Sequence, residues 1–135
     1  MDVDWIATDP ESGRLSGMER RSSAEEYVAR IEALRALGWG YSEVHMSGAD
    51  FPGLALSFRG GYAVVHQFAA EDKVLLLAGD GVIADDETVL VPMLDDIDDA
   101  TFTGAVVLST ARAFAAVREF VRHGSVEDLG DWEEL

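Results

Sequence analysis

Two apolar segments joined by a pair of glycines constrain the fold of this chain more than any other feature. Residues 54–58 alternate large and small side chains, residues 62–68 form a second strand-like segment, and Gly60 and Gly61 lie between them. Glycine supplies the positive φ that a tight hairpin turn requires. The pattern therefore predicts a β-hairpin and, with it, an antiparallel sheet. Further strands are predicted at residues 41–46, at residues 74–78 as a central strand, and at residues 88–91 up to Pro92.

A helix is predicted before these strands. Ser22 or Ser23 is suited to cap its N-terminus, and a glutamate three residues later completes a capping box. Gly38 is its natural end, because glycine readily adopts the left-handed conformation of a helix C-cap. Its apolar face is formed by residues at helical spacing: Tyr27, Val28, Ile31, Leu34 and Leu37.

A second helix is predicted late in the chain, from Ser109 or Thr110 to His123 and Gly124. The tail after it, residues 125–135, is expected to add one last short strand. The apolar stripe of this helix consists of Phe114, Val117, Phe120 and Val121.

Length and composition indicate a single domain over residues 1–135. The chain has 135 residues, of which 48% are apolar, and no Cys, so its stability must come from one hydrophobic core without disulfides. Residues 1–21 are expected to be irregular, with Trp5 and Ile6 in a short edge strand. The order of the elements predicts an α+β fold, with an antiparallel sheet of about five or six strands and two main helices packed on one face.

The charge balance restricts the partners of the chain. It has 26 acidic and 10 basic residues, a formal net charge of −16. Direct binding to nucleic acid or to an anionic membrane is disfavoured, because both depend on Lys and Arg. A basic protein is the favoured partner, although high charge also serves solubility alone. The chain begins without an apolar signal segment and has no apolar run of membrane-spanning length, so we expect a cytoplasmic protein.

A search for catalytic chemistry finds no candidate. The sequence lacks a G-x-S-x-G elbow, a phosphate-binding glycine loop and the H-E-x-x-H spacing. His45 and His66 fall on predicted strands, which leaves a cross-strand pair open, and His123 sits where a helix dipole favours a cation. We therefore expect no catalytic residues, no cofactor and no metal site.

Carboxylates gather in two stretches. Residues 80–99 contain eight Asp and Glu and no basic residue, and the tail is acidic as well. The spacing does not match a calcium-binding loop. The stretches are either solvated loops or a docking surface for a basic partner, to which the nearby Trp would add a typical hot-spot side chain. The candidate partner-binding residues are Asp85, Asp86, Glu87, Asp95, Asp96, Asp98, Asp99, Glu127, Asp128, Asp131, Trp132 and Glu133.

The late helix and the tail carry a family resemblance. The residues concerned are Ala111, Ala113, Ala116, Glu119, Phe120, Gly124 and Trp132. In their spacing, and in the helix-then-strands order before them, the chain resembles the first-numbered immunity family of bacterial polymorphic toxin systems, which is common in actinobacteria. The specific part covers about the last third of the chain. Ser125 and Val126 stand where that family often has Arg-Pro.

The resemblance implies an immunity protein that binds and neutralises a cognate toxin. Many such toxins are nucleases or deaminases with basic clefts, which an acidic inhibitor would complement. Two alternatives stay open at this point: a small-molecule-binding or enzymatic α+β domain, and an interaction subunit of a larger complex.

Overall fold

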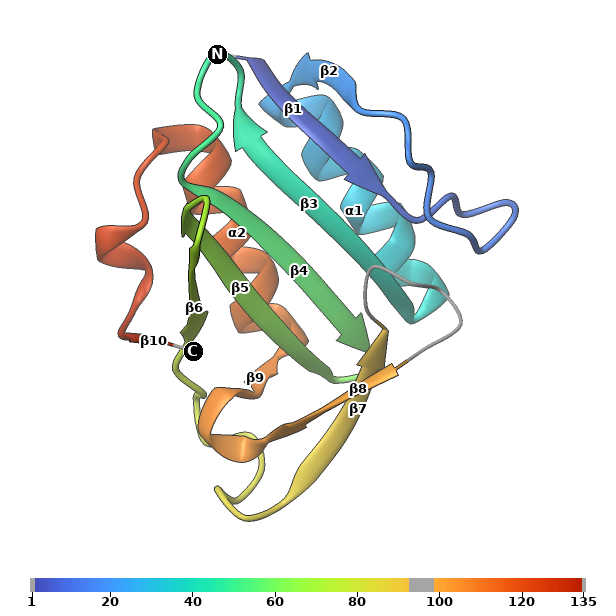
Figure 1. Cartoon of the computed structure of the whole chain (residues 1–135). Coiled ribbons are helices and arrows are strands. Elements are labelled where there is room, and N and C mark those ends of the chain that lie inside the picture. The colour runs from blue at the N-terminus through green and yellow to red at the C-terminus, as the bar shows by residue number, and fades with distance from the viewer. Residues whose placement is uncertain (1, 93–98, 135) are drawn as a thin grey trace.

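The computed structural model describes residues 2–92 and 99–134, and it confirms an α+β fold. Antiparallel strands form one eight-stranded sheet, more strands than the five or six predicted (Figure 1). The order across the sheet is β10 (Trp132–Glu134), β6 (Lys73–Leu77), β5 (Tyr62–Ala70), β4 (Gly53–Arg59), β3 (Trp39–Met46), β1 (Asp2–Ala7) and β2 (Arg20–Ser23), with β9 (Leu108–Ser109) paired to β5. The predicted hairpin is β4–β5. The predicted central strand is β6, which only β10 separates from the edge of the sheet.

Both helices lie on one face of the sheet, behind it in Figure 1. They are α1 (Ala24–Leu37) and α2 (Thr110–His123), close to the predicted bounds. The hydroxyl of Ser23 accepts a hydrogen bond from the amide of Glu26 at 3.2 Å and caps α1. Gly38 ends this helix with φ 93°. Leu37 is 52% exposed, so it does not belong to the apolar face; it is the last residue of α1, beyond the point where the helix meets the sheet.

The main core fills the space between the helices and the sheet. Its largest side chains are fully buried, and the rings of Phe58 on β4 and Phe114 on α2 meet edge to face with centroids 5.1 Å apart. Tyr27 places its hydroxyl 2.5 Å from the hydroxyl of Ser42, so this buried polar group has a partner. Burial of these large side chains is the main source of stability.

The N-terminal segment differs from the prediction. Residues Asp2–Ala7 form β1, which pairs with β2 on one side and β3 on the other, so it is not an edge strand. Val3 and Trp5 point into the core, while Asp4 lies on the opposite face. The sequence did not reveal this alternation of side chains between the two faces of the strand. An aspartate in a strand is unusual unless its charge has partners. Within the N-terminal segment, residues 8–19 lie between β1 and β2 and belong to neither strand.

The region after β6 adds a second layer. Strands β7 (Thr88–Pro92) and β8 (Asp99–Thr103) form a separate two-stranded sheet, followed by the 3₁₀ turn η1 (Gly104–Val106). β7 lies against β3, β4 and β5. Val64 and Leu76 alternate with core residues of their strands, so the small core that they form with Val91 lies on the face away from the helices. We call this second face of the sheet the open face, because β7 and β8 cover only part of it (Figure 1).

Neither described helix is long and apolar enough to cross a membrane.

Candidate binding surfaces

The loop after β6 and the C-terminal tail meet at the end of β6. β6 pairs with β10, and the amide of Ala78 donates to the carbonyl of Asp131 at 2.8 Å. The amide of Gly79 donates to the carbonyl of Ala105 at 2.7 Å, which holds the loop against η1. These contacts place the carboxylates of both segments along one border of the molecule. We call this set the acidic edge: Asp80, Asp85, Asp86, Glu87, Glu127, Asp128, Asp131 and Glu133.

Most of these charges have no cation beside them. Between residues 60 and 111, Lys73 is the only basic residue against ten acidic ones. Five exposed members of the acidic edge form no ion pair within the part of the chain that the structure describes: Asp85, Asp86, Asp128, Asp131 and Glu133. Self-repulsion of this kind works against the compact state, and a basic partner would relieve it.

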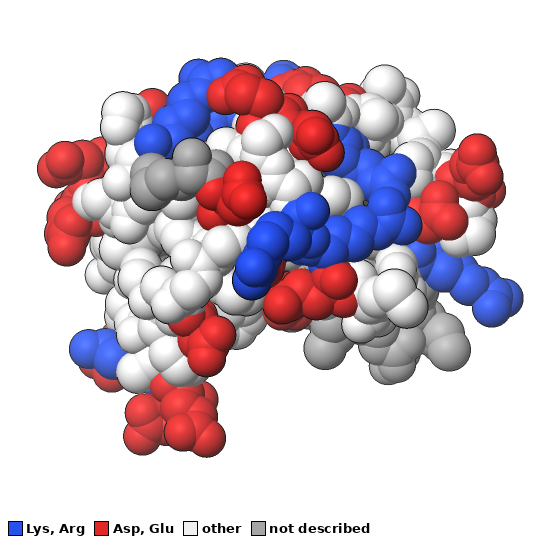
Figure 2. Space-filling view, turned by 90° about the horizontal axis from the view of Figure 1, so that it is seen from above, with Lys and Arg blue, Asp and Glu red and all other residues white. Residues whose placement is uncertain are grey.

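The helical side of the molecule is different. Arg118 on α2 binds Glu32 on α1 at 3.0 Å, and Arg122 lies 3.6 Å from Glu25. Figure 2, which looks onto the end where the chain begins, shows arginine and lysine side chains among carboxylates. Acidic and basic groups are therefore matched there, whereas they are not on the acidic edge.

Three members of the acidic edge are tied to nearby chain. Asp80 accepts hydrogen bonds from the amide and hydroxyl of Ser109 at 3.0 and 2.9 Å. Partial burial works against its charge, but these bonds and one from the amide of Val82 prevail and lower the pKa of Asp80. Glu87 accepts from the amide of Ala84 at 3.2 Å, and Glu127 accepts from a serine hydroxyl at 2.6 Å. These carboxylates stiffen the loops that carry the others.

Trp132 holds the tail in place. Its ring packs against the main core, and its Nε1–H donates to the carbonyl of Val126 at 3.0 Å. Arg112 on α2 donates to the carbonyl of Leu129, the last residue of the 3₁₀ turn η2 (Glu127–Leu129). Trp132 is half-buried, so it supports the tail and offers a partner only part of its ring.

The remaining sequence candidates lie elsewhere. Asp99 begins β8, at the end of the β7–β8 pair far from residues 85–87, and Arg59 binds both of its carboxylate oxygens at 2.8 and 3.0 Å. The structure does not bring Asp99 to the acidic edge, and its charge is matched. Asp95, Asp96 and Asp98 lie outside the described residues.

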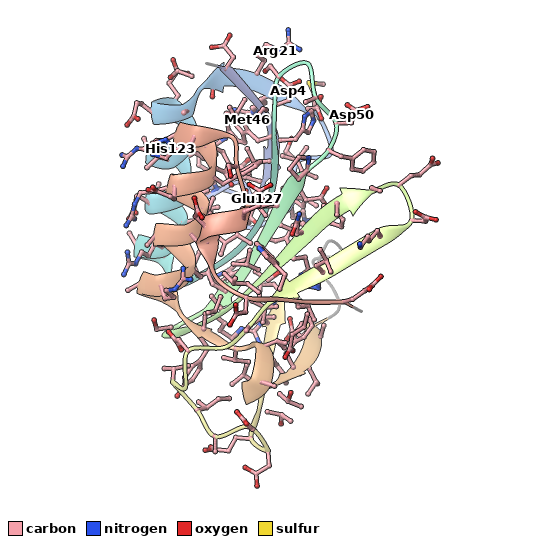
Figure 3. All side chains as sticks on the ribbon, turned by 90° about the vertical axis from the view of Figure 1, so that its left-hand side faces the viewer. Asp4, Arg21, Met46, Asp50, His123 and Glu127 are labelled. Atoms are coloured by element: carbon pink, nitrogen blue, oxygen red, sulfur yellow. The ribbon has the colours of Figure 1, made fainter. Side chains whose placement is uncertain are left out.

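A buried carboxylate lies at the other end of the open face. Arg21 donates to Asp4 through Nε at 2.8 Å and Nη2 at 3.2 Å, and the hydroxyl of Ser47 donates at 2.8 Å. The hydrogen bonds from Arg21 and Ser47 lower the pKa of Asp4 to about 2. Figure 3 shows Asp4, Arg21 and Asp50 at this end, whereas Met46 points toward the helices. This site could not be predicted from the sequence, because its residues come from three separate segments.

His45 lies beside Asp4. Its Nδ1–H donates to the carbonyls of Met46 and Ala49 at 3.1 and 3.0 Å, and its Nε2 lies 3.2 Å from Glu19. Burial works against the charged ring, but these groups prevail and raise the pKa of His45. Asp4, Glu19 and His45 are close enough to share a metal ion, with one ligand atom each within 4.8 Å. Arg21 and the imidazolium already neutralise the two carboxylates, so the geometry favours an ion-pair network.

A hollow of about 250 Å³ adjoins this network on the open face. Its walls are Glu43 and His45 on β3, Asp50 and Phe51 in the next loop, and Phe68 on β5. Gly53 and Leu54 of β4 complete the lining. The hydroxyl of Tyr41 donates to Glu43 at 2.6 Å. The hollow therefore combines two aromatic rings with two carboxylates.

His66 does not pair with His45, because β4 runs between their strands. Its ring meets Phe102 of β8 edge to face, with centroids 5.5 Å apart, and its Nδ1 has no hydrogen-bond partner among the described residues. Burial lowers the pKa of His66, so the ring is neutral at pH 7.

No protein-family model and no curated protein matches this chain. Function is therefore inferred from these surfaces and from the roles of individual residues.

The residues that carry the family resemblance have structural roles here. Phe120 is fully buried in the main core, and Gly124 ends α2 in the left-handed conformation with φ 72°. Glu119 lies 3.3 Å from His123 one turn later in the same helix. Together with Trp132, these residues fix how the tail leaves α2. The residues that carry the resemblance therefore belong to the end of α2 and to the tail, which position part of the acidic edge.

Proposed function

We propose that this protein is an immunity protein that acts in the cytoplasm by binding, without catalysis, and neutralises a cognate toxin with a basic surface. The acidic edge is the docking surface. The observation that carries the proposal is the group of exposed carboxylates without ion-pair partners on two segments that meet at the end of β6. The resemblance of the late helix and tail to an immunity family supports the same reading.

The electrostatics favour recognition of a basic cleft. A nucleic-acid-targeting enzyme presents Lys and Arg where it contacts phosphates, and carboxylates can occupy the same positions. Complementary fields raise the association rate and suppress wrong partners. On the helical side, Arg118 and Arg122 already lie beside two of the glutamates, Glu32 and Glu25.

The acidic edge is also held in a fixed shape. β10 is hydrogen-bonded to β6, Trp132 packs on the core, and Asp80 is bound to the N-cap of α2. A surface that is ordered before binding loses less conformational entropy when the complex forms. This suits an inhibitor that must bind tightly.

Co-expression with the toxin encoded by a neighbouring gene tests the proposal directly. We expect the two proteins to co-purify and the chain to suppress the toxicity. Absence of both effects with every neighbouring toxin gene would overturn the proposal and favour one of the alternatives.

Charge variants then locate the surface. The triple variant Asp85→Asn, Asp86→Asn and Asp131→Asn should slow association by about three- to tenfold and weaken its salt dependence. A matched control, Asp2→Asn with Glu11→Gln and Glu26→Gln, removes three exposed, unpaired charges elsewhere and should change the rate little. Equal effects of the two triples, measured by stopped-flow or surface plasmon resonance, would mean that only net charge matters.

A further inference from the structure

The hollow on the open face has the chemistry of a cation site. Glu43 accepts one hydrogen bond, from Tyr41, and the Asp50 carboxylate has no partner among the described residues. No lysine or arginine lines the hollow. His45, when protonated, is matched by Glu19 at 3.2 Å, and the neighbouring Arg21 is held by Asp4. Two carboxylates are thus left without a cation.

The aromatic walls select the kind of cation. Phe51 is 44% exposed, although it is large and apolar, and Phe68 is half-buried opposite it. A planar guanidinium stacks on aromatic rings and can donate to two carboxylates at once. An ammonium is a strongly hydrated point charge and uses such walls less well.

The size points to a single side chain. The volume of about 250 Å³ lies below the roughly 300–1,000 Å³ of typical small-molecule sites. Gly53 lies close to β3, because a Cβ at this position would lie 3.2 Å from the carbonyl oxygen of Val44 and 3.5 Å from the Cβ of His45. A side chain at residue 53 would therefore be crowded, and glycine keeps this part of the hollow clear.

The position allows one partner to reach both surfaces. Glu43, Ala55, His66, Leu76 and Glu133 are successive cross-strand partners, so their side chains project from the same face. Four strand spacings of about 4.8 Å put Glu43 roughly 19 Å from Glu133. β7 and β8 lie over the residues between these two positions, so a partner that reaches both must also pass over this strand pair. The span is still within a standard protein interface of about 800 Å² on each partner. Glu133 belongs to the acidic edge.

From these observations we propose that the hollow lined by Glu43, Asp50, Phe51 and Phe68 receives an arginine side chain of the partner protein. The identity of the partner rests on the proposed function, but the arginine preference of the hollow does not. The guanidinium lies between the two carboxylates, and its aliphatic stem lies along the phenylalanines. The open face thus supplies a specific anchor, and the acidic edge supplies long-range attraction.

The first test uses blocked arginine, N-acetyl-arginine methylamide, added to the ¹⁵N-labelled full chain at about 0.15 M salt. We expect saturable NMR shifts at the amides of Asp50, Phe51, Gly53 and Phe68. Blocked citrulline, which has nearly the same shape and no charge, should bind at least about fivefold more weakly, and blocked lysine should also bind more weakly. Equal shifts with citrulline, or shifts confined to other regions, would overturn the proposal.

Variants assign the effect to the hollow. Glu43→Gln with Asp50→Asn should abolish the shifts at Gly53, and Phe51→Ala should weaken them. The control pair Glu11→Gln with Glu26→Gln loses the same charge far from the hollow and should bind blocked arginine as the parent does. Thermal melts check that each variant is folded. An unchanged titration in the folded double variant would also overturn the proposal.

The two proposals can fail separately. If blocked arginine binds in the hollow but no toxin co-purifies, the arginine site stands and the immunity function fails. If the toxin binds but blocked arginine does not shift the hollow, the immunity function stands and the arginine site is wrong.

Discussion

The two faces of the sheet are built in opposite ways. On the helical face, Phe58, Phe114 and their neighbours form a continuous apolar core that contains few polar atoms. The open face carries Asp4, Glu43, His45 and His66 between patches of apolar surface, and the β7–β8 pair covers only part of it. The helical face thus accounts for most of the stability, while the open face is available for binding. The following predictions test this difference between the two faces.

The largest effect is expected in the main core. Phe114→Ala should lower the free energy of unfolding by about 3–5 kcal/mol, because it leaves a cavity among fully buried side chains. Phe51→Ala on the open face should cost under about 1 kcal/mol, since that ring is partly in water already. Urea unfolding of both variants measures the difference. Similar losses would contradict the division between the faces.

The second-largest effect is expected on the stability of the fold at low pH. The pKa of Asp4 is about 2 in the folded protein against 3.8 ordinarily, so its charged form stabilises the fold above pH 3.8. This contribution is lost as the pH falls from 3.8 through 2. Asp4→Asn should therefore be less stable than the parent at neutral pH, and the gap should close toward pH 2. A gap that stays constant in urea titrations across this range would show that Arg21 and Ser47 do not hold the charge.

Two matched N-caps give a smaller effect. Ser23 caps α1 and has only that role, whereas Ser109 caps α2 and also binds Asp80 through its amide and hydroxyl. Ser23→Ala should cost about 0.5–1 kcal/mol and Ser109→Ala about 1–2 kcal/mol. The second variant should also loosen the loop of the acidic edge, measured as faster amide exchange at Val82. Equal costs would mean that the Asp80 contact adds nothing.

The smallest effect is expected from two histidines of the open face, His45 and His66, whose contributions to stability depend on pH in opposite directions. The pKa of His45 is raised from 6.5, because its hydrogen bonds to the carbonyl of Met46 and to Glu19 outweigh burial, and that of His66 is lowered, because burial acts there alone. Stability from His45 is present below pH 6.5 and fades as the pH rises through its folded pKa. His66 contributes in the opposite sense and loses stability as the pH falls below 6.5. NMR titration of the ring protons should show His66 titrating at the lower pH, and the reverse order would refute these environments.

The sequence predicted the elements whose signals are local. In both helices the caps and the apolar stripe lie within about fourteen consecutive residues. In the β4–β5 hairpin the turn glycines lie directly between the two strands. The carboxylates of the acidic edge were predicted as two separate acidic stretches of sequence. Only the pairing of β6 with β10 shows that the two stretches meet in the fold. β1 was predicted only as a short edge strand at Trp5 and Ile6, because Asp4 interrupts its pattern and the partners of Asp4, Arg21 and Ser47, are remote in sequence. The hollow was missed for the same reason, since its walls come from β3, β5 and a loop.

The short strand β10 has a consequence for self-association. It covers residues 75–77 of β6, whose apolar sequence Leu75-Leu76-Leu77 would otherwise form an unpaired strand at the border of the sheet. Uncovered apolar strands of this kind pair with other copies and begin aggregation. The acidic side chains of β10 also repel a second molecule that approaches the same border. A chain truncated before Asp131 would lose both protections at once, and its solubility should fall well before its core unfolds.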